Sequence, residues 1–341
     1  MRKSNNANAA KTDEFRNGEK NMSENQGTIR TIMDAIKKID GTEEQKTQLA
    51  KALLRAKNQK VNLMITGATG VGKSSTINAL FDMEKARVGV GSEPETMGIS
   101  KYELESLTIW DTPGLGDGKE KDICHSKKIM DTLLEVDENG DPVIDLVLVI
   151  LDAASRDLGT SYELINQVII RTLGKEAEGR VLIALNKADE ANGGLRNWDL
   201  ENNCPKEATM LYLEEQRETV RRRVKESTGV DVRVVSYKAG YTDPVTGKQE
   251  RPWNLAALLD YIVEYTPAKK RIALVENVNG DPAMWEDSEE LEEHRQSILE
   301  KVVEGLKTAF EIVTGIIAIG KALGELFSHR SGGDFPSFDG K

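Results

Sequence analysis

The residue types best suited to chemistry gather in one glycine-rich turn, which joins an apolar run to a segment with helical character. This turn fits the pattern G-x-x-x-x-G-K-[S/T] and, with the serine after it, consists of Gly67, Ala68, Thr69, Gly70, Val71, Gly72, Lys73, Ser74 and Ser75. Glycines allow successive backbone N–H groups to converge on phosphate oxygens, and a following helix adds the partial positive charge of its N-terminus. We expect Lys73 to bridge the β- and γ-phosphates of a nucleotide and the Ser74 hydroxyl to ligate Mg²⁺.

A second motif indicates which base completes that nucleotide. Asn186, Lys187 and Asp189 follow a later apolar run and fit N-K-x-D. A carboxylate at Asp189 can accept hydrogen bonds from N1–H and the 2-amino group of guanine, whereas adenine would leave it unpaired at a cost of roughly 1–3 kcal/mol. We expect Asn186 to tie this loop to the phosphate turn and the stem of Lys187 to cover one face of the base. After the last apolar run, a backbone N–H of Lys238 or Ala239 is expected to approach guanine O6. The sequence therefore predicts GTP and GDP as ligands.

Two segments between these motifs supply the remaining expected contacts with the metal and the γ-phosphate. Asp111 and Gly114 fit D-x-x-G at the end of an apolar run. We expect Asp111 to hold Mg²⁺ through water and the Gly114 N–H to contact the γ-phosphate. The segment VGSEPETMGIS contains Thr96, the candidate for a switch threonine that completes the Mg²⁺ shell, with Ser92 as its rival.

Short apolar runs that alternate with helical segments predict the fold that must position these residues. The expected strands are 61–66, 107–110, 144–151, 180–185 and 230–236. The expected helices are 73–83, 120–135, 160–173, 205–228 and 254–265. Several of the strands lack a polar–apolar alternation, as is typical of a parallel sheet that is buried on both faces. The pattern predicts an α/β fold with a doubly wound, mostly parallel sheet.

The three motifs together resemble a known family. GATGVGKSSTINALF, WDTPGLGDG and NKAD, in this order, resemble the bacterial Era/TrmE-like branch of the translation-factor-related GTPases, and more closely a group of bacterial GTPases often carried on prophage-like elements. GVGKSSTINAL also resembles the septin, Toc and immune-associated GTPases, which assemble through their G domains. The resemblance covers about 58–266 and implies a P-loop GTPase with Mg²⁺ as cofactor and a G domain whose assembly depends on the nucleotide.

The chain departs from the family pattern at two positions. Lys238 and Ala239 stand where the family has Ser-Ala, which leaves the base contact of that loop open. Gly70 stands where potassium-dependent members have asparagine, so potassium-assisted hydrolysis is not implied.

A third position bears on the rate of hydrolysis. Leu115 follows D-x-x-G, where Ras has the glutamine that orients the attacking water. We therefore expect slow turnover in the monomer and stimulation by self-association or by a partner. Arg156 in LDAASRDLGTS could reach the nucleotide of a neighbouring copy, or it could pair with Asp157 or another carboxylate. With Arg156, the candidate catalytic residues are Lys73, Ser74, Thr96 and Gly114.

The segments that flank the expected G domain (58–270) have a different character. Residues 1–27 are polar and of low complexity, which predicts disorder, and 28–57 have helical character. In the segment 271–341 an acidic linker leads to an amphipathic helix over 297–327. The uncharged part of this helix is too short to span a membrane. We expect it to pack against the G domain or a protein partner, with peripheral membrane contact as the alternative.

Composition narrows the class of protein further. The chain has 341 residues and a formal net charge of −11, which argues against a broad electrostatic grip on nucleic acid. Its two cysteines lack CxxC spacing, so a disulfide framework or a zinc site is not indicated. The first residues contain no apolar signal segment, and we expect a cytoplasmic protein. A GTP-hydrolysing enzyme is the first functional reading. The alternatives are a GTP-gated assembly module with little hydrolysis and a ribosome- or RNA-associated GTPase.

Overall fold

The computed structural model describes residues 33, 36–37, 42–81, 83, 87–89, 98–114, 118–241 and 250–314. Several expectations from the sequence lie outside the described residues: the disorder of 1–27, the switch residue Thr96, Leu115, and the part of the predicted C-terminal helix after 314.

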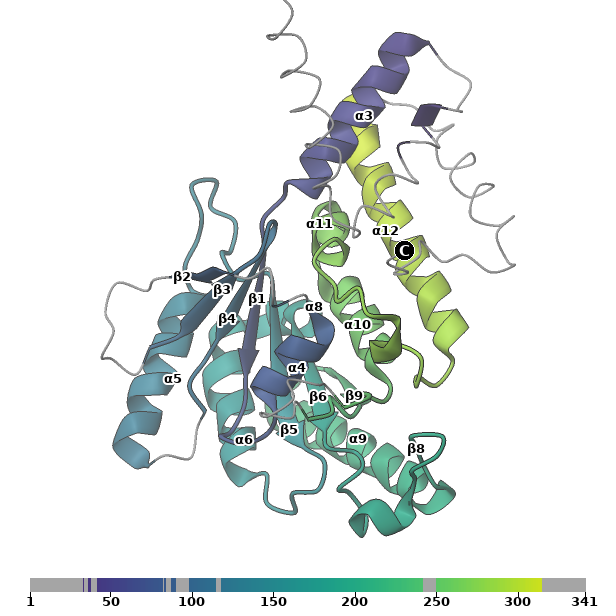
Figure 1. The fold of residues 1–341 in the computed structure, drawn as a ribbon. Coiled ribbons are helices and arrows are strands. Elements are labelled where there is room, and N and C mark those ends of the chain that lie inside the picture. Colours follow the sequence, from purple (N-terminus) through teal and green to yellow (C-terminus); the bar gives the residue numbers. More distant parts are fainter. Residues whose placement is uncertain are drawn as a thin grey trace, which may run out of the picture.

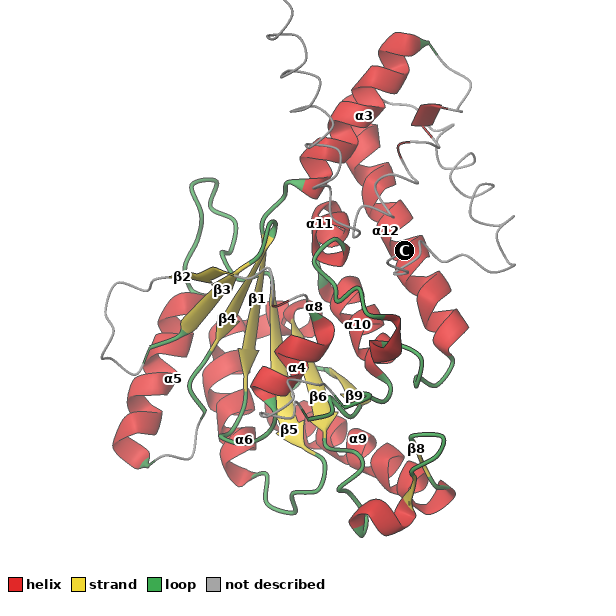
Figure 2. Ribbon diagram, viewed as in Figure 1, coloured by secondary structure: helices red, strands yellow, loops and turns green. Residues whose placement is uncertain are grey.

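A seven-stranded sheet organises the described chain, with the strand order β2-β3-β4-β1-β5-β6-β9 (Figures 1 and 2). The strands are β1 (Val61–Thr66), β2 (Arg87–Gly89), β3 (Ser100–Glu103), β4 (Leu107–Asp111), β5 (Leu146–Asp152), β6 (Val181–Asn186) and β9 (Arg233–Ser236). β1 pairs in parallel with β4 and β5, and β6 pairs in parallel with β5 and β9. This confirms the mostly parallel sheet. The antiparallel edge formed by β2 and β3 is not among the predicted strands.

Helices lie on both faces of the sheet. They are α3 (Glu43–Lys57), α4 (Lys73–Leu80), α5 (Lys119–Leu133), α6 (Gly159–Glu163) with a π-helical continuation (Leu164–Ile170) and α7 (Arg171–Leu173), α8 (Ala177–Arg180), α9 (Glu207–Thr228), α10 (Leu255–Tyr265), α11 (Arg271–Val275) and α12 (Leu291–Thr314). A small hairpin of β7 (Trp198–Asp199) and β8 (Cys204–Pro205) precedes α9. This hairpin is a second feature that the apolar pattern does not predict, because its strands have two residues each.

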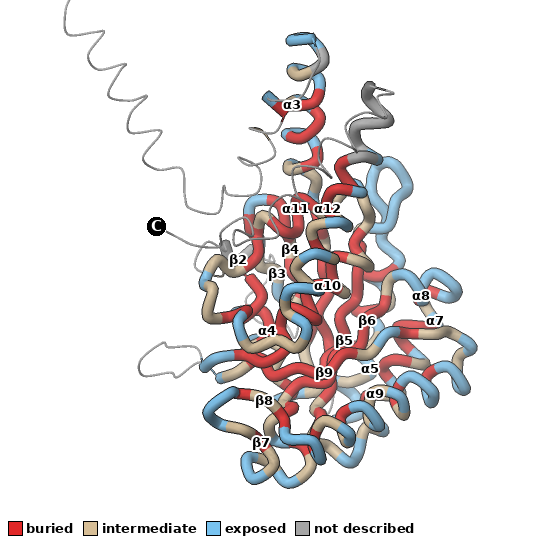
Figure 3. The backbone as a smooth tube through the Cα atoms, turned by 90° about the vertical axis from the view of Figure 1, so that its right-hand side faces the viewer, coloured by how far each residue is buried: buried red, intermediate tan, exposed pale blue. Residues whose placement is uncertain are grey.

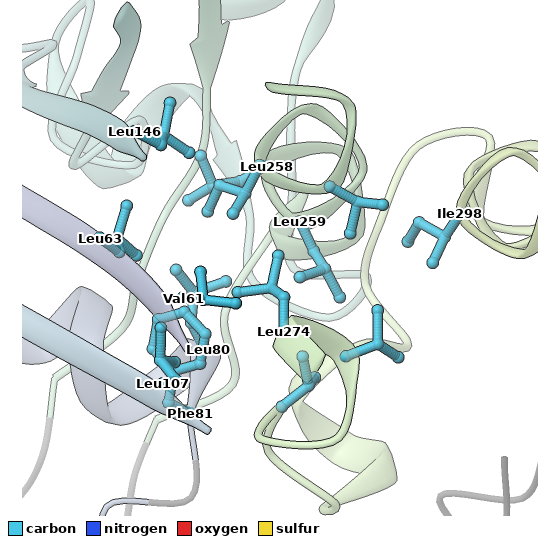
Figure 4. Packing of buried hydrophobic residues seen from close by; sticks show 14 of the residues in the cluster. Val61, Leu63, Leu80, Phe81, Leu107, Leu146, Leu258, Leu259, Leu274 and Ile298 are labelled. Carbon is cyan, nitrogen blue, oxygen red and sulfur yellow. The ribbon is translucent and has the colours of Figure 1, made fainter. Parts of the chain in front are cut away.

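Alternate residues of the central strands form two cores, one on each face of the sheet. On one face Val61 and Leu63 of β1 pack with α4, α10, α11 and α12, and Figure 4 shows these side chains converging with Leu80 and Leu258. On the other face Met64 packs with α5, the helix from α6 to α7, and α9. The central strands are therefore buried between two helical layers, as Figure 3 shows. Burial on both faces explains why these strands are almost continuously apolar.

The C-terminal segment packs against the first of these faces. α12 begins at Leu291, inside the stretch expected to be a linker, and it buries Ile298 and Leu306 in the same core as β1. α12 also lies beside α3 and α10 (Figure 1). The described part of the predicted amphipathic helix therefore uses its apolar side chains within the chain. Within the described part of the chain, we find no helix with the length and apolar character that crossing a bilayer requires.

Ion pairs fix α12 to its neighbours. Asp260 of α10 accepts a hydrogen bond from Lys301 Nζ at 2.8 Å and lies 2.9 Å from His294 Nδ1. Arg271 of α11 pairs with Glu304 at 2.9 Å. Burial acts to raise the pKa of Asp260, but the hydrogen bonds from His294 and Lys301 outweigh it and the pKa is lowered. The contact between α10 and α12 is thus partly electrostatic.

Candidate functional site

The loops that carry the predicted motifs gather at one edge of the sheet. β1, β4, β5, β6 and β9 run in the same direction, so their carboxyl ends meet there. The loops that follow these strands are, in the same order, 67–72, 112–114, 153–158, 187–193 and 237–241. Ligands of open α/β sheets bind outside the carboxyl ends of the strands. This edge is therefore the candidate site.

Glycine is required at two points of the phosphate turn. Gly67 has φ 148° and Gly72 has φ 93°. A Cβ atom at Gly67 would overlap the carbonyl oxygen of Ile150 in β5, and a Cβ at Gly72 would overlap the side-chain amide of Asn186. The turn therefore packs closely against β5 and the end of β6, and a side chain at Gly67 or Gly72 would displace the turn.

The lysine of the turn lies across the turn itself. Lys73 Nζ donates hydrogen bonds to the carbonyl oxygens of Gly67 (3.2 Å) and Ala68 (3.1 Å). Ser74 is exposed and Ser75 is half-buried in the first turn of α4. The ammonium is thus held above the turn, where phosphate oxygens could replace the two carbonyls as its partners.

Asn186 connects three of the loops. Its side chain is buried, its Nδ2 donates to the carbonyl oxygen of Val71 at 2.9 Å, and its Oδ1 accepts from the backbone N–H of Ala239 at 2.9 Å. The phosphate turn, the N-K-x-D loop and the loop after β9 are therefore joined through one amide. The first of these bonds is the tie to the phosphate turn that the sequence led us to expect.

The D-x-x-G segment lies directly against the phosphate turn. A Cβ atom at Gly114 would overlap both the backbone and the hydroxyl of Thr69. Thr112 supports this approach, because its Oγ1 donates to Thr66 Oγ1 at the end of β1 (2.8 Å). Gly114 is therefore brought to the turn by the pairing of β4 with β1.

Asp111 is the carboxylate nearest in sequence to this contact. Its Oδ1 is buried and has no hydrogen-bond partner among the described residues. Burial raises the pKa of Asp111, and the charge of Lys73 opposes that rise. A buried carboxylate oxygen without a protein partner fits a hard cation or one of its waters, which is the kind of ligand that Mg²⁺ takes. Of the other two expected ligands, Ser74 lies at the start of α4 and Thr96 is outside the described residues.

Lys187 has its ammonium fixed by an acidic residue. Its Nζ lies 2.7 Å from Asp152 Oδ2 at the end of β5, and its backbone has φ 62°. Burial acts to lower the pKa of Lys187, but the hydrogen bond and charge of Asp152 outweigh it and the pKa is raised. Lys187 is therefore charged and anchored beside the predicted base loop.

Asp189 is the carboxylate expected to recognise the base. Its side chain is 17% exposed, and its Oδ2 lies 3.8 Å from Lys238 Nζ. Burial raises the pKa of Asp189, and the charge of Lys238 opposes the rise. The structure thus brings together two residues that the sequence assigned to separate contacts.

The loop after β9 carries the two backbone N–H groups that the sequence assigned to guanine O6. The N–H of Lys238 donates to the carbonyl oxygen of Trp253 (3.0 Å), and the N–H of Ala239 donates to Asn186 Oδ1 (2.9 Å). Both groups expected to approach guanine O6 therefore have protein partners in this structure. The partner of the Lys238 N–H follows from the antiparallel bridge between residues 238 and 253.

Arg156 is exposed in the loop after β5, between the phosphate turn and the N-K-x-D loop in sheet order. No carboxylate of the described residues lies within ion-pairing distance of its guanidinium. Asp157, the alternative partner considered from the sequence, accepts instead from the N–H of Gly159 at 2.9 Å. Arg156 is therefore exposed in this loop without an ion pair to a described residue.

One contact at the site has no sequence motif. Tyr237 Oη and Thr76 Oγ1 lie 2.6 Å apart, both residues being buried, and they join α4 to the loop after β9. Burial raises the pKa of Tyr237. Thr76 follows the G-K-S-S run by one residue and Tyr237 precedes Lys238, but neither belongs to a pattern that predicts their pairing.

The fold and the arrangement of these loops match the G domain of P-loop GTPases. Residues 62–187, less than half of the chain, match the model of a family described as 50S ribosome-binding GTPase. The finer resemblance to the Era/TrmE-like branch stays a prediction.

Sequence relatives cover limited parts of the chain. Translocase of chloroplast 108 from Physcomitrium patens is 35% identical over 101 residues, which are 28% of this chain and 10% of that protein. Dynamin-like protein 1 of Campylobacter jejuni is 33% identical over 88 residues, 24% of this chain and 12% of the relative. YkfA of Escherichia coli (strain K12) is 27% identical over 176 residues, 48% of this chain and 57% of the relative. The chain therefore matches 10% and 12% of the first two proteins and 57% of the third.

Two solved structures align with more than half of this chain. The G domain of the T. maritima FeoB iron transporter aligns with 61% of this chain and 99% of its own, with a TM-score of 0.32 and 24% identity. Toc33 from Arabidopsis thaliana in complex with Mg²⁺ and GMPPNP aligns with 72% of this chain and 96% of its own, with a TM-score of 0.39 and 15% identity.

Proposed function

We propose that this protein binds GTP together with Mg²⁺ and hydrolyses it to GDP and phosphate. The observation that carries the proposal is the junction at Asn186, which joins the phosphate turn, the N-K-x-D loop and the loop after β9 at the edge where the strands end. A nucleotide bound there would have its phosphates at the turn and its base near Asp189. A single nucleotide would thus contact all of these loops.

The roles of the described residues follow from their positions. Lys73 would exchange its two carbonyl partners for β- and γ-phosphate oxygens. The Gly114 N–H, held against Thr69, would donate to the γ-phosphate. Ser74 and Asp111 would hold Mg²⁺. Thr96, which lies outside the described residues, is the proposed third protein ligand of the metal. Bound Mg²⁺ neutralises the charge that develops on the phosphates during transfer.

We further propose that hydrolysis is slow in the monomer and is stimulated by a nucleotide-dependent homodimer or by a partner. Leu115 has no hydrogen-bonding group with which to orient the attacking water. The site as built from one copy therefore depends on a group from elsewhere. Arg156 is exposed and has no carboxylate neighbour among the described residues, which supports a contact with the nucleotide of a second copy.

A GTP-gated assembly module with little hydrolysis is the second candidate function. The apolar Leu115 favours it, because loss of the water-orienting side chain lowers turnover without affecting the binding of nucleotide. The two candidates share the site and differ in the rate of phosphate release.

The test is phosphate release from GTP and from ATP over a range of protein concentrations, with oligomeric state followed by light scattering. We expect release from GTP alone, with a specific activity that rises as dimers form, and we expect Lys73→Ala to abolish it. Dimers that form with a non-hydrolysable GTP analogue but release no phosphate would favour the assembly module. Equal rates with GTP and ATP would contradict the proposal.

A further inference from the structure

A lysine ammonium is buried beside the carboxylate that we propose recognises the base. The side chain of Lys238 is only 7% exposed, and its Nζ lies 3.8 Å from Asp189 Oδ2. Lysine is almost never buried unless its charge is paired. The Ser-Ala pattern of the family that the sequence resembles would place a small neutral hydroxyl here, whereas this chain places a charge.

The ammonium of Lys238 has two further polar neighbours. It donates to Glu250 Oε1 at 2.9 Å and to Asn203 Oδ1 at 3.2 Å. The indole of Trp198 lies beneath it, with the ring centroid 5.9 Å from Nζ. An ammonium has three N–H donors; Glu250 and Asn203 each accept one, and Asp189 lies at ion-pairing distance.

Asn203 is itself held in place, so the ammonium has little freedom to move. Its Oδ1 also accepts from Trp198 Nε1 at 3.2 Å. Its Nδ2 donates to the carbonyl oxygen of Pro252 (2.9 Å) and to Asp287 Oδ2 (2.8 Å). These partners come from the β7–β8 hairpin, the segment before α10 and the segment before α12. Three parts of the chain therefore fix the position of one lysine head group.

We propose that Lys238 is a positioning residue for guanine recognition, whose buried ammonium keeps Asp189 charged and directed toward the base. Asn203 and Glu250 hold the ammonium in place. This inference rests on the proposed function, because it assumes that Asp189 accepts the N1–H and 2-amino hydrogens of guanine. It deepens that function by assigning the side chain of Lys238 a task distinct from the expected backbone contact.

The charges around Asp189 explain why a cation is needed there. A carboxylate can accept two hydrogen bonds from guanine only in its ionised form. Burial favours the neutral form and raises the pKa of Asp189; Lys238 lowers it, and Glu250 raises it again. From its own loop, Lys187 and Glu190 also face this region, with Lys187 already paired to Asp152. Lys238 is therefore the cation that acts most strongly on Asp189.

Two substitutions should shift the titration of Asp189 in opposite directions. Lys238→Met removes the charge and keeps most of the apolar stem, so the carboxylate should be protonated at higher pH. Glu250→Gln removes a competing negative charge and retains a hydrogen-bond acceptor for Lys238, so the carboxylate should stay charged to lower pH. A residue with a purely structural role would not give shifts of opposite sign.

The experiment measures the affinity for GDP carrying a fluorescent N-methylanthraniloyl group, from pH 5 to pH 8, in the full chain with Mg²⁺. The same label on IDP, which lacks the 2-amino group, reports the contact with Asp189 directly. Lys238→Arg tests rescue by a second cation. Lys225→Met is the matched control, because that lysine of α9 forms an exposed ion pair with Asp231, which follows the helix. Thermal unfolding of each variant shows whether it is folded.

We expect Lys238→Met to raise the midpoint of the pH profile by about one unit, since an opposite charge within about 4–6 Å lowers a carboxyl pKa by ~1–3. At pH values below both midpoints this corresponds to GDP binding that is roughly tenfold weaker. The preference for GDP over IDP should shrink as well. Glu250→Gln should lower the midpoint, Lys238→Arg should restore most of the affinity, and Lys225→Met should match the wild type.

A wild-type pH midpoint in folded Lys238→Met would overturn the inference, and so would equal weakening by Lys238→Met and Glu250→Gln without any change in the profile. If Lys238→Met fails to fold, the pH midpoint of Glu250→Gln still tests the inference. The absence of a downward shift of that midpoint would also overturn the inference. Failure of the wild-type protein to bind GDP at any pH would instead overturn the proposed function on which the inference rests.

Discussion

The amide of Asn186 offers the sharpest single test of how the site is assembled. Replacing Asn186 by alanine removes two buried hydrogen bonds of 2.9 Å, one to the carbonyl oxygen of Val71 and one from the N–H of Ala239. A buried hydrogen bond contributes about 1 kcal/mol net, so the two together contribute about 2 kcal/mol. If that energy holds the loops in their binding geometry, its loss corresponds to about 30-fold in the dissociation constant for GDP.

Titration calorimetry with GDP measures this loss, and thermal unfolding measures the accompanying loss of stability. Asn62→Ala is the matched control, because Asn62 Oδ1 accepts one hydrogen bond from Trp110 Nε1 (3.0 Å) near the start of β1, at the opposite end of that strand from the phosphate turn. We expect the control to lose about 1 kcal/mol of stability and to keep its affinity for GDP. An Asn186→Ala protein that binds GDP as the wild type does would refute the view that this amide organises the site.

Three further predictions concern other parts of the chain. Gly72→Ala should abolish nucleotide binding and lower the stability by about 1–3 kcal/mol, because its Cβ would overlap the Asn186 amide at a residue with φ 93°; calorimetry and thermal unfolding report both effects. Arg156→Ala should keep GDP affinity but lose the rise in specific activity with concentration, and an unchanged rise in phosphate release would exclude a role in trans. Because the pKa of Asp260 is lowered in the folded protein, its stabilising contribution should be present above about pH 4 and be lost as the pH falls through the lowered value. Asp260→Asn should therefore destabilise the protein at pH 7 and flatten the pH dependence of unfolding below about pH 4, whereas an unchanged acid limb would contradict this.

The sheet was predictable because the sequence of its central strands is almost continuously apolar. Val61–Thr66 is apolar at nearly every position, since residues on both faces are buried, and the glycine turn after it marks where the strand ends. β2 and β3 were not predictable in the same way. β3 reads Ser-Lys-Tyr-Glu and has no buried residue, because it lies at an antiparallel edge with little core to face.

The residues of the candidate site were also predictable only in part. Motifs identify groups that act through local backbone geometry, such as Gly72 and Gly114, because the spacing of residues along the chain fixes where those groups lie. They do not reveal contacts between distant segments. The contact of Lys238 with Glu250 and Asn203 depends on how the β7–β8 hairpin and the segment before α10 fold against the loop after β9. No local pattern in the sequence records that packing.

The C-terminal helix shows a similar limit. Helical periodicity predicted an amphipathic helix over 297–327, but the pattern alone left open whether a G domain, a protein partner or a membrane receives its apolar face. In the structure Ile298 and Leu306 face α10 and α11 in the core. The helix starts six residues early, at Leu291, because the acidic stretch before 297 includes Glu292 and Glu293, which suit the positive end of a helix.

The central claim is that the carboxyl edge of this sheet is a guanine nucleotide site, and equilibrium binding tests it most directly. Titration of the full chain with GDP and with ADP, in the presence of Mg²⁺, compares two ligands that differ only in the base. We expect saturable binding of one GDP per chain and binding of ADP at least about 100-fold weaker, since the wrong base leaves Asp189 unpaired. Equal affinity for GDP and ADP would contradict it.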